Sequence, residues 1–196
     1  MMTTQRFTAI TAAFAGIFVT TLVVSASSPA ATPENPTADV SVARGEYLVN
    51  AMGCHDCHTP MAMTAEGPKP DMTRALTGHP SAMVMPPAPK LPPGPWLWMG
   101  AATNTAFAGP WGVSHSANLT PDKDTGLGTW TVDQFIATMK TGRRLGKGRQ
   151  LLPPMPYQAL GGLTDDDIRS LFVYLQSLKP VSNKVPQPVE PAEGGR

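Results

Sequence analysis

Cys54-His55-Asp56-Cys57-His58 dictates what kind of core this chain can build. The chain holds only these two cysteines, so no disulfide can join distant segments. Two thiols separated by two residues and followed at once by a histidine form the attachment pattern of c-type haem. On a tight helical turn, the thiols of Cys54 and Cys57 can reach two vinyl groups at one porphyrin edge, and His58 then lies beneath the iron as its proximal ligand. The motif predicts one covalent haem c, which supplies a large apolar body for the core.

Three other interpretations of the motif are weaker. A structural zinc site needs four ligands, and no fourth ligand stands at a recognisable spacing from Cys54, Cys57 and His58. The histidines outside the motif, His79 and His115, do not form a zinc-type pair. A thioredoxin-like dithiol requires a βαβ pattern, which the sequence lacks. An inert pair of buried cysteines leaves the adjacent His58 unexplained.

The N-terminus is typical of an export signal. Arg6 precedes an uncharged stretch of 18 residues, 7–24, that is rich in alanine, valine, isoleucine and phenylalanine. Small residues around Ala26 then offer a cleavage site. We therefore expect residues 1–26 to form a signal peptide that delivers the rest of the chain to the periplasm. The alternative is an uncleaved membrane tether through residues 7–24, a length at the lower limit for crossing a bilayer.

Composition divides the remainder of the chain into three parts. Residues 27–40 are rich in proline, serine and alanine, and should form a flexible linker. A single domain is expected over residues 41–181, because 196 residues are too few for two cores of ordinary size. Prolines, glycines and charges without periodicity predict a disordered tail over residues 182–196. Within the domain, ten prolines between residues 60 and 95 predict a long loop without helix or strand.

Three principal helices are predicted, which makes the domain all-α. The first covers residues 42–52 and runs into the cysteine motif. The second begins after Thr131, whose side chain can form a capping box with Gln134, and its apolar residues recur at helical spacing. The third begins after Thr164 with three aspartates, which favour the positive end of the helix dipole, and carries an apolar stripe that ends before Pro180.

A second axial ligand has to be chosen among 11 methionines. A thioether on the iron raises the reduction potential of a haem. Met155 is the predicted ligand, because the prolines around it restrict the backbone of its loop before the iron binds. Met83 and Met85, which also stand near prolines, remain alternatives. A histidine ligand, His79 or His115, is a minor alternative, since a lone loop histidine is usually solvated.

A cluster of five cations precedes the loop that contains Met155. They are Lys140, Arg143, Arg144, Lys147 and Arg149. One interpretation places them near the haem edge, where they pair with propionates or steer an acidic partner. The other interpretation is a solvated, glycine-rich turn.

Several segments of the sequence resemble class I cytochromes c. They are Arg44-Gly45-Glu46-Tyr47-Leu48, the cysteine motif, Ser116–Asp122, Gly128-Thr129-Trp130, Met155-Pro156-Tyr157 and the helix after Thr164. The chain most resembles the haem modules in cytochrome subunits of membrane-bound alcohol and sugar-acid dehydrogenases, although those subunits usually carry several haem motifs and this chain carries one. The resemblance implies a class I fold of about three main helices around one haem, with the iron held by His58 and Met155. It also implies that the first and last helices cross where Gly45 approaches Tyr174.

Together these features predict a periplasmic electron carrier rather than an enzyme. Its haem iron would cycle between ferrous and ferric states in a respiratory or dehydrogenase-linked chain, with a dehydrogenase or a terminal oxidase as redox partner. The alternative is a haem enzyme or gas sensor whose sixth coordination position is open. A net charge of +1 gives no reason to expect nucleic acid as a partner.

Overall fold

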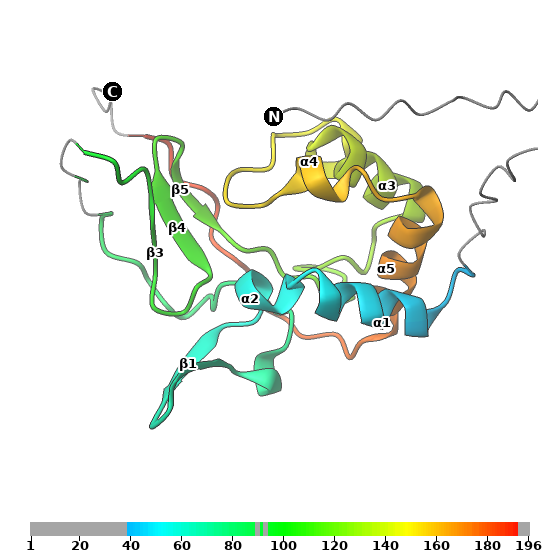
Figure 1. Ribbon diagram of the computed structural model, residues 1–196, viewed down its shortest axis with the longest axis horizontal. Coiled ribbons are helices and arrows are strands. Elements are labelled where there is room, and N and C mark those ends of the chain that lie inside the picture. Colours follow the sequence, from blue (N-terminus) through cyan, green and yellow to red (C-terminus); the bar gives the residue numbers. More distant parts are fainter. Residues whose placement is uncertain (1–38, 89–90, 92–93, 192–196) are drawn as a thin grey trace, which may run out of the picture. The chain divides into compact units, whose positions relative to one another are not determined.

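The computed structural model describes residues 39–88, 91 and 94–191 (Figure 1). The predicted signal peptide or tether, and all of the predicted linker except its last two residues, lie outside this set. Every described residue belongs to one compact unit, Thr37–Arg196. Among the described residues, no helix combines the length and the apolar character needed to span a bilayer.

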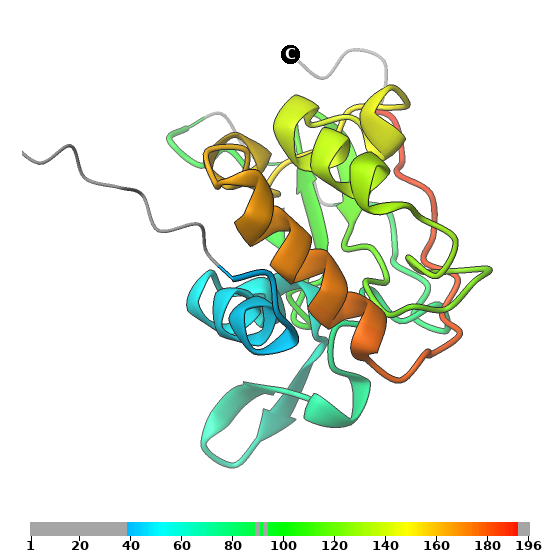
Figure 2. The same cartoon turned by 90° about the vertical axis from the view of Figure 1, so that its right-hand side faces the viewer.

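Helices α1 (Val42–Ala51) and α5 (Asp165–Ser177) form the most extensive contact between two elements of the domain. Figure 2 shows α5 running diagonally across α1. Gly45 permits this approach, because a Cβ atom there would collide with the main-chain carbonyl of Ser170 and would lie 2.6 Å from Cβ of Tyr174. The predicted crossing at Gly45 is confirmed.

Helix α3 (Val132–Thr141) packs against α5 and begins with the predicted capping box. The hydroxyl of Thr131 accepts from the N–H of Gln134 at 3.2 Å, and the N–H of Thr131 donates to the side-chain oxygen of Gln134 at 3.0 Å. Phe135 of α3 and Phe172 of α5 pack with their ring centroids 5.3 Å apart. This pair belongs to a core made of Leu48, Val49, Leu76, Leu127, Phe135, Met139, Ile168, Leu171, Phe172 and Leu175.

Thr164 caps α5 as predicted, because its hydroxyl accepts from the N–H of Asp167 at 3.1 Å. Replacing Thr164 by alanine removes this acceptor, so we expect the free energy of unfolding to fall by about 1 kcal/mol. Chaotrope unfolding of the two proteins measures the difference. Thr129→Ala is the matched control, since Thr129 is exposed, and an equal loss in both variants would contradict the capping role.

The prediction of an all-α class I fold is wrong, because the described residues form five α-helices and two antiparallel sheets. The two remaining helices are short, α2 (Cys54–His58) and α4 (Tyr157–Leu160). One sheet pairs β1 (Met61–Thr64) with β2 (Gly67–Pro70). The other has the strand order β3-β4-β5, formed by Met99–Gly100, Ala106–Gly109 and Gly112–His115. The domain is therefore mixed α and β.

The sheet of β1 and β2 lies within residues 60–95, where the density of prolines predicted a loop without strands. Pro68 and Pro70 lie in β2, opposite Met63 and Met61. Residues two apart on a strand direct their nitrogens to the same side, and in a two-stranded sheet each strand has a free edge. Both prolines can therefore face that edge without losing a hydrogen bond of the ladder. In the second sheet the strands are two to four residues long, too short for a period of two to stand out.

Residues 182–191, which were expected to belong to a disordered tail, run back across the domain and bond to it. Val189 pairs with β5 through two main-chain hydrogen bonds of 2.8 and 2.9 Å. The side chain of Asn183 donates to the carbonyl oxygens of Thr77 and His79, at 2.7 and 2.9 Å. These contacts attach the segment both to β5 of the larger sheet and to residues 77–79.

Candidate functional site

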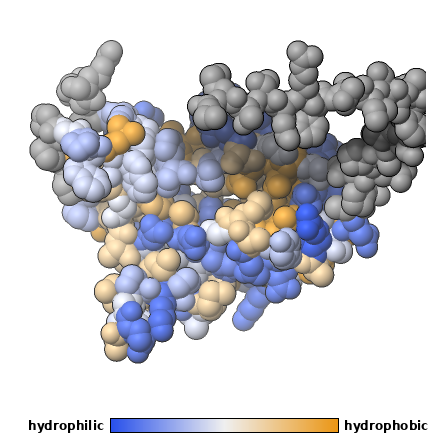
Figure 3. All heavy atoms as spheres, in the orientation of Figure 1, coloured by the Kyte–Doolittle hydropathy of each residue, from blue (hydrophilic) through white to orange (hydrophobic). Residues whose placement is uncertain are grey.

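A cavity of about 390 Å³ opens between α2, α3 and the loops that follow β5 and precede α4. Figure 3 shows the hollow, with apolar residues gathered inside it. Pockets for cofactors typically have volumes of about 300–1,000 Å³ and mostly apolar walls. The apolar part of this wall includes Val49, Phe107, Leu119, Leu127, Leu151 and Leu171. The space therefore suits an organic cofactor with a large apolar surface.

Cys54 and Cys57 both line this cavity from the single turn of α2. Gly53 allows the turn to start here, because its φ of 67° lies in the left-handed region, which glycine adopts without strain. The two thiols are free rather than disulfide-bonded. Burial raises the pKa of Cys54 to about 11 and also raises the pKa of Cys57. Both are thus neutral thiols, unlike the low-pKa cysteine of a redox-active dithiol.

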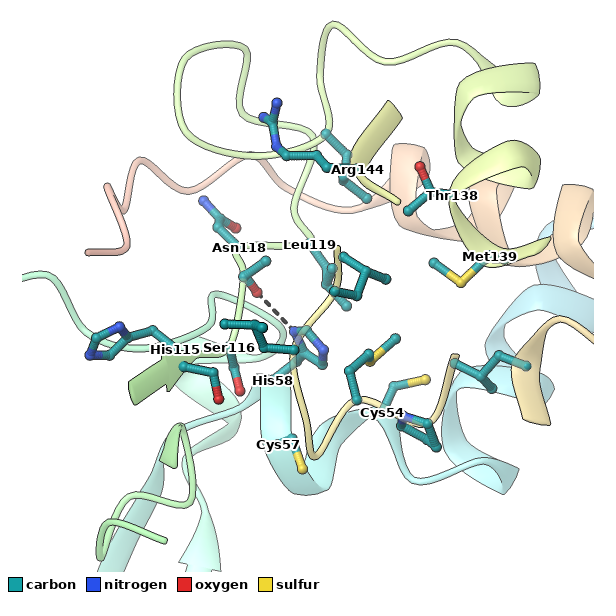
Figure 4. A pocket seen from close by; sticks show the side chains of 18 of the residues that line it. Cys54, Cys57, His58, His115, Ser116, Asn118, Leu119, Thr138, Met139 and Arg144 are labelled. Carbon is teal, nitrogen blue, oxygen red and sulfur yellow. Dashed lines mark hydrogen bonds between the residues drawn. The ribbon is translucent and has the colours of Figure 1, made fainter. Parts of the chain in front are cut away.

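His58 follows these cysteines and is only 8% exposed. Its Nδ1 lies 2.8 Å from the carbonyl oxygen of Ala117, the contact drawn as a dashed line in Figure 4. Because a carbonyl oxygen can only accept, Nδ1 carries the proton and Nε2 holds the lone pair. Burial lowers the pKa of the ring, which keeps it neutral. A neutral imidazole whose other nitrogen donates to a carbonyl is the usual form of a metal-ligating histidine.

Met155 lines the same cavity, in the loop before α4. Ser114 of β5 holds this loop, because its hydroxyl donates to the carbonyl oxygen of Pro153 at 2.6 Å. The structure thus brings together the four residues that the sequence singled out. Two further methionines line the cavity, Met52 and Met139, and the second projects from α3 (Figure 4).

The alternative ligands named from the sequence are placed less favourably. Met83 and Met85 do not line the cavity. His79 is buried, and its two ring nitrogens lie 3.0 Å from the Thr105 hydroxyl and 3.0 Å from the Met83 carbonyl oxygen. His115 does line the cavity, but its ring packs beside that of His79, with centroids 4.9 Å apart. Of these two histidines, only His115 lines the cavity.

Two arginines also line the cavity, Arg144 and Arg149. Arg144 lies over the ring of Trp130, 5.4 Å from its centroid. Burial and the nearby charge of Arg144 lower the pKa of Arg149. Over residues 39–88, 91 and 94–191 neither arginine forms an ion pair, whereas Lys140 of the same basic cluster pairs with Asp165 at 3.2 Å.

These observations together test whether the site fits a haem. Two arginines without carboxylate partners suit the two propionates that a haem carries. Two neutral thiols, a neutral imidazole and a mostly apolar wall suit its vinyl groups, its iron and its ring. The residues present therefore fit haem c.

Sequence reasoning did not find the partner of His58. Ala117 lies within Ser116–Asp122, a segment with a resemblance to class I cytochromes c. Every residue has a main-chain carbonyl, so the residue type does not indicate which carbonyl accepts from His58. Phe107 and Ser114, which form another part of the wall, belong to the hairpin of β4 and β5 that the sequence did not predict. Their contribution could be seen only after the second sheet was known.

Comparison with known proteins yields relatives over most of the described domain, although no protein-family model matches the chain. The fructose dehydrogenase cytochrome subunit of Gluconobacter japonicus is 30% identical over 173 residues, covering 86% of this chain and 28% of the relative. The gluconate 2-dehydrogenase cytochrome c subunit of Pantoea cypripedii is 29% identical over 162 residues, covering 82% and 29%. The cytochrome c subunit of the quinone alcohol dehydrogenase of Gluconobacter oxydans (strain 621H) is 29% identical over 148 residues, covering 74% and 23%.

The chain therefore spans only about a quarter of the length of these curated relatives. Because the similarity covers 86% of the chain, it must include the cysteine motif. Within that span, this chain is a homologue of the cytochrome c subunits of fructose, alcohol and gluconate dehydrogenases.

Proposed function

We propose that this protein carries one covalent haem c and transfers single electrons within a dehydrogenase-linked chain, without acting on a substrate of its own. The observation that carries the proposal is the convergence of Cys54, Cys57 and His58 on one mostly apolar cavity. The names of the relatives support the partner class, because each is a cytochrome subunit of a dehydrogenase. A dehydrogenase on the donor side is thus the proposed redox partner.

Each residue of the cavity has a role in this proposal. The thiols of Cys54 and Cys57 would hold the haem through thioether bonds to its vinyl groups. His58 and Met155 would be the protein ligands of the iron, and Arg144 and Arg149 would neutralise the propionates. The bound haem supplies an iron that exchanges one electron between its ferrous and ferric states. The apolar wall keeps water from the iron and so limits reorganisation when the charge changes.

The proposed place of action is the periplasm. Residues 1–26 would direct export, and thioether-linked haem is consistent with a chain that matures outside the cytoplasm. Fractionation of the native host, with N-terminal sequencing of the mature protein, tests both statements. A mature N-terminus near Ser27 is expected, and a cytoplasmic protein that begins at Met1 would contradict export.

Absorption spectra of the purified protein in both redox states test the haem directly. We expect low-spin iron in both states and haem that stays with the polypeptide after acid–acetone extraction. A colourless protein, made with intact cytochrome-maturation machinery, would overturn the proposed function. Rapid binding of carbon monoxide to the reduced protein at neutral pH would instead show an open sixth position, and so an enzyme or gas sensor.

Replacing Met155 by alanine tests the second axial ligand. We expect the far-red sulfur-to-iron band of the oxidised protein to disappear and the reduction potential to fall, because the thioether favours ferrous iron. Met83→Ala is the control, since Met83 lies outside the cavity and should leave both properties unchanged. If the band survives in Met155→Ala and is lost in Met139→Ala or Met52→Ala, the ligand is one of those two residues.

A further inference from the structure

The hydrogen bond from His58 to Ala117 depends on a peptide group that lies in a loop. Its oxygen belongs to the peptide that joins Ala117 to Asn118, between β5 and α3. Main-chain hydrogen bonds of 2.9 Å hold Ser116 and Leu119 on either side. The orientation of the peptide between them depends on the backbone angles of Ala117 and Asn118, which no helix or strand fixes.

The side chain of Asn118 fixes this part of the loop. It is buried, with only 3% exposure. Its Oδ1 accepts from the N–H and from the hydroxyl of Thr120, at 3.0 and 2.8 Å. Its Nδ2 donates to the hydroxyl oxygen of Thr125 at 3.1 Å and to the carbonyl oxygen of Val181 at 2.8 Å. Two donors and two acceptor positions are all used, so the side chain has a single satisfied orientation.

The partners of Asn118 are themselves anchored. The hydroxyl of Thr125 donates to Oδ1 of Asp122 at 2.5 Å and accepts from the N–H of Asn183 at 3.0 Å. The N–H of Val181 donates to the hydroxyl oxygen of Thr120 at 3.1 Å. Asn118 therefore joins the loop that contains Ala117 to a tight turn and to the segment that follows α5. Buried polar networks of this kind, when fully satisfied, rigidify the backbone that they hold.

We propose that Asn118 is a positioning residue that sets the strength of the hydrogen bond from His58 to Ala117, and through it the reduction potential of the haem. The inference rests on the proposed function, because it requires His58 to be an iron ligand. A firm hydrogen bond from Nδ1–H makes Nε2 more basic, and a more basic axial nitrogen stabilises ferric over ferrous iron. By holding the acceptor oxygen in place, Asn118 keeps the potential lower than it would otherwise be.

The test compares haem-loaded Asn118→Ala with the wild-type protein. We expect an upward shift of the midpoint potential in a spectroelectrochemical titration. We also expect the His58 Nδ1 proton, followed by nuclear magnetic resonance, to exchange with deuterium faster than in the wild type. Asn50→Ala is the matched control, because Asn50 is exposed on α1. Thr164→Ala provides a second control, since it weakens the fold at the start of α5 without touching this network.

The possible outcomes distinguish a role of Asn118 in setting the potential from a role in stability alone. They also show separately whether the proposed function fails. If Asn118→Ala lowers the unfolding temperature as Thr164→Ala does but leaves both the potential and the exchange rate unchanged, the inference is wrong. If Asn118→Ala does not accumulate as holoprotein, Thr125→Val removes one acceptor of Asn118 and should shift the potential in the same direction by less; no shift there overturns the inference. A wild-type protein without attached haem overturns the proposed function itself.

Discussion

Replacing Gly45 by leucine is expected to prevent α1 and α5 from crossing, and so to abolish the folded domain. Even the first carbon of a side chain would collide with the main-chain carbonyl of Ser170 and lie 2.6 Å from Cβ of Tyr174. Overpacking a core typically costs about 1–3 kcal/mol, and more where backbone rather than a flexible side chain must move. Both contacts here involve atoms close to the backbone of α5, so the cost should reach the upper end of this range or exceed it. Domains of this size are stable by only about 5–15 kcal/mol.

The measurement is the yield of soluble holoprotein together with its thermal unfolding. Ala43→Leu is the matched control, because it places the same side chain on the exposed side of α1. We expect Ala43→Leu to behave as the wild type. If Gly45→Leu instead retained the wild-type unfolding temperature, the close contact between α1 and α5 at Gly45 would be contradicted.

Removing both thiols, in Cys54→Ala/Cys57→Ala, is expected to abolish covalent attachment of haem completely. No other cysteine exists in the sequence to replace them. The protein should then give no haem-stained band on a denaturing gel, and any pigment should be extracted by acid–acetone. Because the haem would no longer fill the 390 Å³ cavity permanently, the unfolding temperature should also fall.

The single variants are informative controls for this experiment. Cys54→Ala and Cys57→Ala each leave one thiol on α2, and each should retain a smaller but detectable fraction of attached haem. His58→Ala keeps both thiols and removes the proposed iron ligand, so it tests whether haem can be attached to the cysteines without that ligand. Haem that stayed covalently bound in the double variant would show that the attachment site lies elsewhere.

Local signals predicted the parts of this fold that local interactions determine. The capping box of Thr131 and Gln134, and the cap at Thr164, could be read from residues three apart, and both are present in the structure. Such interactions join residues within one helical turn, so the local sequence is enough to predict them. The close approach at Gly45 was also anticipated, although from a resemblance rather than from the pattern of residues.

Features that depend on distant parts of the chain were not predicted. Pro68 and Pro70 favoured a loop, because proline cannot donate a main-chain hydrogen bond. The register of β1 and β2 shows that the nitrogens of both prolines can face the free edge of the sheet. The segment around Asn183 has no periodicity, and what orders it is hydrogen bonding to carbonyls 104 and 106 positions earlier in the sequence. The carbonyl of Ala117 was also not predicted, because it lies 59 positions from His58 in the sequence.

The return of residues 181–189 across the domain has a consequence for the order of events during biogenesis. In the proposed export the chain would emerge in sequence order, so the thiols of α2 would be exposed before Asn183 arrives to bond to Thr77, His79 and Thr125. Closing loops of such length is slow relative to forming a single helical turn. On the proposed function, haem would therefore be attached while the segments around the cysteine motif are still open, and the later docking of residues 181–189 would complete the surroundings of the haem.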